Sequence, residues 1–467
     1  MKKKKEKIIL TDITVTDYAA EGKALARVDG KVIFISGAVP GDVVDVFITK
    51  SKKDWAEGRV EKIKQYAPDR TQPFCQHFGV CGGCKWQMLP YHLQLQYKEQ
   101  EALQNLKRIG KLDLPASLPI LGAASTEQYR NKLEFTFSNK RYLLPEEAAN
   151  PVTEQSGALG YHAPRLFDKV IGIEECFLMD PINNLIRNTV RAFALKNEYS
   201  FYDFRLHTGW LRNIVIRYSS KGELMVNMIL NYEEEAERIK LLDHLLEKVP
   251  AITSLVYTIN PKWNDSIYDL TPQLYFGKGY IMEQLEDFQF KISPKSFFQT
   301  NTKQAEQLYR VARDFAELSG NEIVYDLYCG TGSIGIFLSK QAKKIIGVEV
   351  VAEAIEDAKE NAALNQITHA QFFAGDVIKI CNDDFFQAHG RPDVIITDPP
   401  RAGMHEKLIV KLLEMAAPKI VYVSCNTATQ ARDLALLDEK YRIKKIQPVD
   451  MFPHTHHIES VVLLELK

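Results

Sequence analysis

The last third of the chain alternates short apolar segments with amphipathic stretches, and this alternation constrains the fold more than any other feature of the sequence. Four apolar segments predict strands, at residues 322–327, 345–349, 393–398 and 419–424. The stretches between them have the periodicity of helices, most clearly from residue 351 to residue 365. Apolar strands separated by helices form a parallel sheet that is covered on both faces. Residues 291–467 are therefore predicted to form a Rossmann-like α/β domain.

Two further domains are expected, because a chain of 467 residues exceeds what one hydrophobic core usually serves. Residues 8–66 contain short alternating strands broken by turn signals, which is typical of a small OB-like β-barrel. We assign this barrel to residues 1–68. Residues 69–290 mix strand-like and helical stretches and contain a cluster of cysteines, so a central α+β domain is predicted there. The overall prediction is a multidomain α/β protein.

Charge is balanced over the chain but unevenly placed. Of the 59 basic and 60 acidic residues, residues 1–140 contain 23 basic and 16 acidic ones. A basic N-terminal part indicates a polyanion-binding module joined to a part with another task. No apolar run approaches the ~20 residues of a membrane span, and no signal-peptide core follows the N-terminus. A cytoplasmic protein without membrane contact is expected, and nothing predicts more than a monomer.

A glycine-rich loop follows the first predicted strand of the C-terminal domain. Residues 326–335 contain three glycines at the spacing G-x-G-x-x-G. Glycines at this spacing let the backbone turn sharply and approach a nucleotide closely. Glu349 ends the next strand, where a carboxylate can bind ribose hydroxyls. Sites for NAD and for S-adenosylmethionine share this pattern, so the loop alone does not identify the cofactor.

Two later strand ends distinguish these cofactors. Asp398 and Cys425 each follow a predicted strand, and ligands of open α/β sheets bind beyond such ends. Hydride transfer needs no thiol, whereas methyl transfer to C5 of uracil does, because C5 becomes nucleophilic only after a thiolate adds to C6. Cys425 is the predicted nucleophile. Glu459, just before the final strand, is the predicted base that removes the C5 proton.

Five motifs, found in this order, resemble the RNA uracil-5-methyltransferases that use S-adenosylmethionine, in the branch with an N-terminal TRAM domain and an iron–sulfur cluster. They are Ser-Phe-Phe-Gln-Thr-Asn at 296–301, the glycine loop at 326–335, Asp-Pro-Pro-Arg at 398–401, Ser-Cys-Asn at 424–426 and His-Ile-Glu-Ser at 457–460. The resemblance covers nearly the whole chain. It implies that Cys425 is the nucleophile and Glu459 the base. It also implies a set of cofactor-binding residues: Gln299, Tyr328, Glu349 and Asp398, with Asp376 beside the adenine.

Three of the seven cysteines lie in one short segment, at Cys75, Cys81 and Cys84. A cytosolic chain keeps its thiols reduced, so a metal site is favoured over disulfides. Cys176 is the nearest candidate for a fourth ligand, and four thiolates suit zinc or an iron–sulfur cluster. The spacing leaves both open. The resemblance, in which these four positions match, favours a [4Fe–4S] cluster with a structural role.

RNA is the predicted partner. A uracil in a folded RNA must leave its stack before Cys425 can reach C6, and aromatic and basic residues should line its path. Residues 129–132 and the alternating strand 212–217 are the candidates. The resemblance favours a uridine of 23S rRNA over one of tRNA. Alternatives from other classes are a non-catalytic RNA-binding scaffold, which the intact Cys425 and Glu459 oppose, and an NAD-dependent oxidoreductase, which gives Cys425 no purpose.

Overall fold

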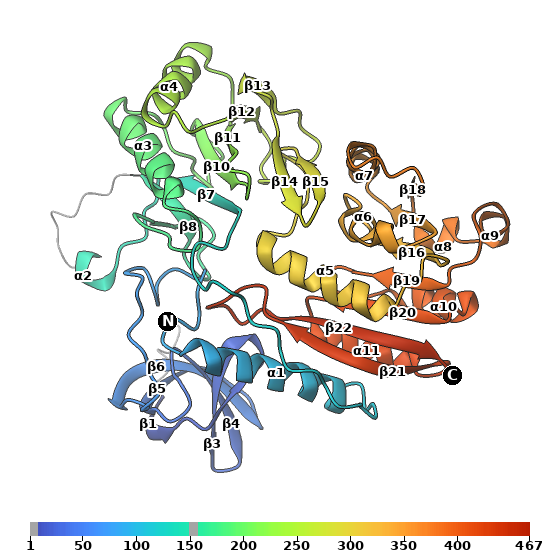
Figure 1. The fold of residues 1–467 in the computed structure, drawn as a ribbon. Helices are drawn as coiled ribbons and strands as arrows, with labels where there is room; N and C mark the ends of the chain where they lie inside the picture. Colours follow the sequence, from blue (N-terminus) through green and yellow to red (C-terminus); the bar gives the residue numbers. More distant parts are fainter. Residues whose placement is uncertain (1–7, 149–156) are drawn as a thin grey trace.

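The computed structural model describes residues 8–148 and 157–467 (Figure 1). Within these residues, three sheets of six, seven and seven strands and one two-stranded hairpin build the fold. No helix of this described part is long and apolar enough to cross a membrane. The multidomain α/β prediction is confirmed.

The N-terminal sheet is the barrel-like body drawn in blue in Figure 1, with strand order β1-β5-β6-β4-β3-β2. Its strands alternate buried and exposed residues, and side chains such as Ile33, Ile35, Val44 and Val46 form one apolar interior. The six strands are β1 (Ile9–Thr14), β2 (Asp17–Ala19), β3 (Lys23–Val28), β4 (Lys31–Ser36), β5 (Val43–Ser51) and β6 (Trp55–Gln65).

The central sheet has the order β13-β12-β11-β10-β7-β8-β9 and is antiparallel except for the pair β11 and β12. Its interior strands β10 and β11 are buried almost throughout. The strands are β7 (Lys132–Ser138), β8 (Ala158–His162), β9 (Val170–Gly172), β10 (Leu211–Tyr218), β11 (Leu224–Leu230), β12 (Ser254–Ile259) and β13 (Gln273–Gly277). The accompanying helices are α2 (Pro145–Ala148), α3 (Ile182–Lys196) and α4 (Glu235–Lys248), and the hairpin β14 (Ile281–Leu285) and β15 (Phe288–Ile292) follows.

The C-terminal sheet has the order β18-β17-β16-β19-β20-β22-β21. The first five strands are parallel, and β22 pairs antiparallel with β20. The chain moves outward from β16 in one direction and then returns to add β19 on its other side, which creates a switch point between β16 and β19. The strands are β16 (Ile323–Leu327), β17 (Lys344–Glu349), β18 (Ala370–Ala374), β19 (Val394–Thr397), β20 (Lys419–Ser424), β21 (Tyr441–Val449) and β22 (Glu459–Leu466).

Helices accompany this sheet as the sequence predicts. They are α5 (Thr302–Ala316), α6 (Ser333–Leu338), α7 (Ala352–Leu364), α8 (Val377–Ile380), α9 (Asp383–His389), α10 (Glu406–Met415) and α11 (Thr427–Leu437). One earlier helix, α1 (Tyr91–Arg108), also packs here, against α11 and β21 (Figure 1). Its Leu106 joins the core beneath the C-terminal sheet. A helix from the cysteine-containing part of the chain therefore contacts the α/β sheet.

Candidate active site

Sheet topology brings Cys425, Asp398 and Glu459 to one edge. Asp398 and Cys425 follow the parallel strands β19 and β20 directly. Glu459 begins β22, which runs antiparallel to β20, so that Ser424 lies opposite Ser460. The start of β22 therefore meets the carboxyl end of β20. The thiol of Cys425 lies close enough to the carboxyl groups of Asp398 and Glu459 for their charges to change its pKa.

The thiol of Cys425 is partly buried, and this burial is the main reason why its pKa is raised to about 11. The charges of Glu459 and Asp398 raise the same pKa further. The guanidinium of Arg401 opposes them through its charge and a hydrogen bond to the thiol. Arg401 is thus the group that favours the thiolate. The sequence motifs did not assign a role to Arg401, although its position three residues after Asp398 could have indicated that it lies at the same sheet edge.

Three carboxyl groups along this edge of the sheet have pKa values above the usual range of a carboxylic acid. Burial raises the pKa of Glu459, which is 5% exposed, and repulsion from Asp398 adds to the effect. Burial likewise raises the pKa of Asp398 to about 7 and that of Asp326, at the end of β16, to about 7. A positively charged group in this crevice would lower the pKa of all three acids.

The glycine loop has the backbone that its sequence predicts. Gly330 and Gly332 have φ values of 52° and 75°, which residues other than glycine rarely adopt. A Cβ on Gly332 would also lie 2.9 Å from the ring of Phe372. The loop is tied to the end of β17, because the amide of Gly330 donates to Oε2 of Glu349 at 3.3 Å. Loop and carboxylate therefore form one unit.

A cavity of about 430 Å³ lies beside this unit. Three of the five residues predicted to bind the cofactor line it: Tyr328, Glu349 and Asp376. An aromatic ring together with carboxylates that can accept from hydroxyls is a donor set that fits a nucleoside. Gln299 and Asp398 lie outside its lining. The remaining lining comes from Val348, Val350, Gly375, Val377, Ile378, His405, Lys407 and Leu408.

Comparisons with known proteins show the family to which this chain belongs. A sequence model described as tRNA (uracil-5-)-methyltransferase matches residues 270–467, and a TRAM domain model matches residues 11–60. An uncharacterized RNA methyltransferase of Bacteroides thetaiotaomicron is 55% identical over 96% of this chain and 100% of the relative. Another, of Porphyromonas gingivalis, is 52% identical over 96% and 98%. The chain belongs to the RNA uracil-5-methyltransferase family.

A solved structure matches the methyltransferase over almost its full length. It is the tRNA (uracil-54, C5)-methyltransferase of Pyrococcus abyssi in complex with S-adenosyl-L-homocysteine. The TM-score is 0.75 at 26% sequence identity, over 97% of this chain and 100% of that chain. The two proteins therefore share their architecture from the N-terminal sheet to the C-terminal one.

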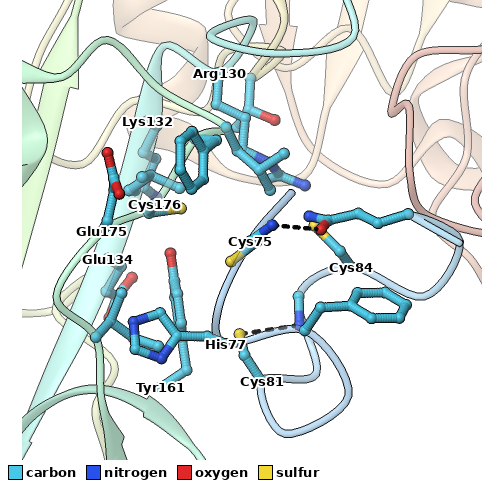
Figure 2. Close-up of a pocket in the computed structure, with 18 residues that line it drawn as sticks. Cys75, His77, Cys81, Cys84, Arg130, Lys132, Glu134, Tyr161, Glu175 and Cys176 are labelled. Atoms are coloured by element: carbon cyan, nitrogen blue, oxygen red, sulfur yellow. Dashed lines mark hydrogen bonds between the residues drawn. The ribbon is translucent and has the colours of Figure 1, made fainter. Parts of the chain in front are cut away.

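The four clustered cysteines of the methyltransferase line one cavity of about 340 Å³. Figure 2 shows Cys75, Cys81 and Cys84 on one loop and Cys176 on the opposite wall, with its sulfur directed toward Cys75. The loop is held in part by hydrogen bonds, because the amide of Cys75 donates to Oε1 of Gln87 at 3.2 Å. The fold therefore brings together four cysteines that are separated by up to 101 positions, between Cys75 and Cys176.

The thiols of this cavity lie close enough to raise one another's pKa. Burial raises the pKa of Cys81 to about 11 and that of Cys84 to about 12, and the neighbouring cysteines raise both further. In residues 8–148 and 157–467, however, no three His, Cys, Asp or Glu side chains form a group that could hold a metal ion. The four soft donors fit a metal cluster chemically. The predicted iron–sulfur site is not confirmed.

One prediction about RNA contact is wrong. Arg212 and Arg217, on the alternating strand β10, are only 1% and 4% exposed. Arg212 donates to the carbonyls of Asn260 and Asn264, and Arg217 donates to the carbonyl of Ser296 at 2.7 Å. Neither side chain can reach RNA from these positions. Because β10 lies in the middle of a sheet, its arginines bind loop carbonyls inside the protein.

Proposed function

We propose that this protein methylates C5 of a uridine in 23S rRNA, with S-adenosylmethionine as the methyl donor. The observation that carries the proposal is the meeting of the Cys425 thiol and the buried Glu459 carboxyl where the end of β20 faces the start of β22. This meeting point lies in the same sheet edge as the cavity lined by Tyr328, Glu349 and Asp376. A nucleophile and a base beside a nucleoside-sized cavity are what methylation of a uracil carbon requires.

In the proposed mechanism, the thiolate of Cys425 adds to C6 of the uracil, and the electrons of the C5–C6 double bond move to the ring as an enolate. S-adenosylmethionine, when bound, supplies the methyl group that C5 takes up. Glu459 then removes the C5 proton. The electron pair left on C5 restores the double bond and expels the thiolate, which frees the product.

Environment suits the two residues to these roles. Arg401 stabilises the thiolate of Cys425 by charge and a hydrogen bond. A raised pKa makes the ionised carboxylate of Glu459 a stronger base than an exposed one. We assign cofactor binding to Tyr328, Glu349 and Asp376 in the cavity. Gln299, in the motif at 296–301, and Asp398, after the end of β19, complete this proposed set.

We also propose that Cys75, Cys81, Cys84 and Cys176 hold a [4Fe–4S] cluster. Their common cavity and mutual electrostatic influence support this proposal. A bound cluster would reverse the effect of burial, because cations deprotonate coordinating thiols. Its proposed role is structural.

The choice of 23S rRNA rests on the resemblance to the branch with a TRAM domain and a cluster. A tRNA substrate is the second candidate, favoured by the match to a tRNA methyltransferase structure. A cytoplasmic location, a monomeric state and domain boundaries after residues 68 and 290 stay predictions.

The experiment that tests the proposal maps 5-methyluridine in rRNA and tRNA of a strain that lacks the gene. One 23S rRNA position should lose its methyl group and regain it with the wild-type gene, but not with Cys425→Ala. Loss in tRNA alone would transfer the activity to the second candidate. Unchanged methylation in both RNAs would reject the proposed function.

A further inference from the structure

The segment 450–454, which leads toward Glu459, is held by polar side chains at every residue. Lys98 in α1 is fully buried and donates to Oδ1 of Asp450, also fully buried, at 2.6 Å. The same Nζ donates to the carbonyl of Phe452 at 3.1 Å. Tyr91 donates to Oδ2 of Asp450 at 3.0 Å. One lysine therefore binds two positions of the segment.

The other residues of this segment are held by three further side chains. Asn301 donates to the carbonyl of Met451 at 2.9 Å, and the hydroxyl of Tyr129 donates to the carbonyl of Pro453 at 3.0 Å. The amide of His454 donates to Oε1 of Gln94 at 2.8 Å, and Nε2 of Gln94 lies 3.1 Å from Nδ1 of the His454 ring. The amides of Lys85 and Trp86 donate to the carbonyl of His454, so the cysteine loop also meets this segment.

The sequence of α1 explains why these groups point the same way. Tyr91, Gln94 and Lys98 follow one another at intervals of three and four residues, so they lie on one face of the helix. Ala102 and Leu106 continue this face as buried apolar residues. A buried lysine is rare and costs free energy unless it is paired. A methionine would fill the same space, but it could not bind Asp450 and the Phe452 carbonyl together.

The segment continues directly from the strand end that faces Glu459. In the hairpin of β21 and β22, Val449 is the residue directly opposite Glu459. Asp450 follows Val449, so the Lys98 contact fixes the strand end that faces the proposed base. The backbone of Leu121 contacts the same strand end, because the amide of Asp450 donates to the carbonyl of Leu121 at 2.8 Å.

We propose that Lys98, together with Asp450, is a positioning residue for Glu459. This inference rests on the proposed function, in which Glu459 removes the C5 proton after methyl transfer. Loss of the pair should therefore slow proton removal more than RNA binding. The covalent species between Cys425 and the methylated RNA should accumulate.

The test replaces the pair by apolar residues in Lys98→Met/Asp450→Leu, because such a replacement often leaves stability unchanged, whereas removal of one partner strands a buried charge. Turnover should fall by about tenfold to a hundredfold, as for a misplaced catalytic group. The KM for RNA should stay within about twofold, since only interactions in the reaction step are lost. A covalent protein–RNA band should appear on a denaturing gel.

Two controls separate this inference from the proposed function. Lys107→Met, an exposed position on the same helix, should behave as wild type in every readout. Glu459→Gln should accumulate the covalent band. If it does and Lys98→Met/Asp450→Leu turns over as wild type, the positioning role is overturned and the function stands. If Glu459→Gln gives no band, the proposed role of Glu459 fails, and the positioning role fails with it.

A milder variant decides the matter if the double variant does not fold. Tyr129→Phe removes only the hydroxyl that binds the Pro453 carbonyl and keeps the ring. The loss of one hydrogen bond should lower turnover about fivefold with a visible covalent band. Wild-type turnover without that band would overturn the proposal.

Discussion

At the scale of single residues, burial and the charge of Arg401 act in opposite directions on the pKa of Cys425. Burial and two neighbouring carboxyl groups raise the pKa of its thiol, whereas Arg401 lowers it. Without RNA and cofactor, the thiol is therefore protonated at neutral pH. A positively charged methyl donor near Asp398 and Glu459 would weaken their effect on the thiol. We therefore expect the thiolate of Cys425 to form mainly when the site is filled.

Alkylation of Cys425 in the ligand-free protein tests this reasoning. Because the pKa of the thiol lies at about 11, the thiolate fraction and the alkylation rate should rise roughly tenfold per pH unit from pH 7 to pH 10. Mass spectrometry of the tryptic peptide 420–432 measures the rate. Arg401→Gln should alkylate more slowly at each pH. A rate that levels off near pH 7 would contradict the raised pKa.

Sequence motifs identified the candidate catalytic residues but not the side chains that surround them. The meeting of Cys425 and Glu459 at one sheet edge was predictable, because each lies at the end of a predicted strand, and their catalytic roles stay proposals. The burial of Lys98 was not, because a helix with a lysine on its inner face looks like an exposed helix in the sequence. The arginines of β10 were misjudged for a related reason: an alternating pattern does not show which face of a strand is covered.

At the scale of elements, the parallel strands of the C-terminal sheet could be predicted from the sequence more closely than its antiparallel hairpin. The alternation of strands and helices predicted β16, β17, β19 and β20 to within a few residues, because each lies buried between helices. The antiparallel hairpin of β21 and β22 was predicted only at its second strand. β21 carries mixed polar and apolar residues, and the amides of Leu118 and Leu121, from a much earlier part of the chain, donate to its carbonyls.

Gly332→Ala tests the loop. The positive φ alone costs about 1–2 kcal/mol in a residue with a Cβ, and the added Cβ would meet Phe372 at 2.9 Å. The melting temperature should fall, and the affinity for S-adenosyl-L-homocysteine should drop at least about tenfold. Thermal unfolding and calorimetry measure the two effects.

Gly320→Ala is the matched control. Gly320 also has a positive φ, of 95°, but nothing lies within 4 Å of its added Cβ. This variant should lose stability and keep its affinity for S-adenosyl-L-homocysteine. Equal affinities in Gly332→Ala and Gly320→Ala would show that the loop does not contact the cofactor.

At the scale of the whole molecule, α1 links parts of the chain that are distant in sequence. It follows the cysteine loop, packs against α11, and contacts the segment that leads into Glu459 (Figure 1). The predicted division into three parts did not include this link. Helix periodicity shows which face is apolar, but it does not show which sheet covers that face.

The iron content of the whole protein tests the cluster. Protein purified without oxygen should be brown and contain about four irons, as expected for one cubane on four thiolates. Cys176→Ser should lose most of this iron, because it removes the only ligand from outside the loop. Cys381→Ser, at a buried position outside the cavity, should keep it. Colourless wild-type protein with zinc would reject the cluster.

The central claim is that the sulfur of Cys425 bonds to C6 of a uracil during methylation. RNA that carries 5-fluorouridine at the target position tests it, because Glu459 cannot remove fluorine as a proton. With S-adenosylmethionine, the wild-type protein should form a stable complex in which peptide 420–432 carries the methylated nucleotide. Cys425→Ala should form none and should not methylate normal RNA. Methylation by Cys425→Ala, or an adduct on another cysteine, would contradict the claim.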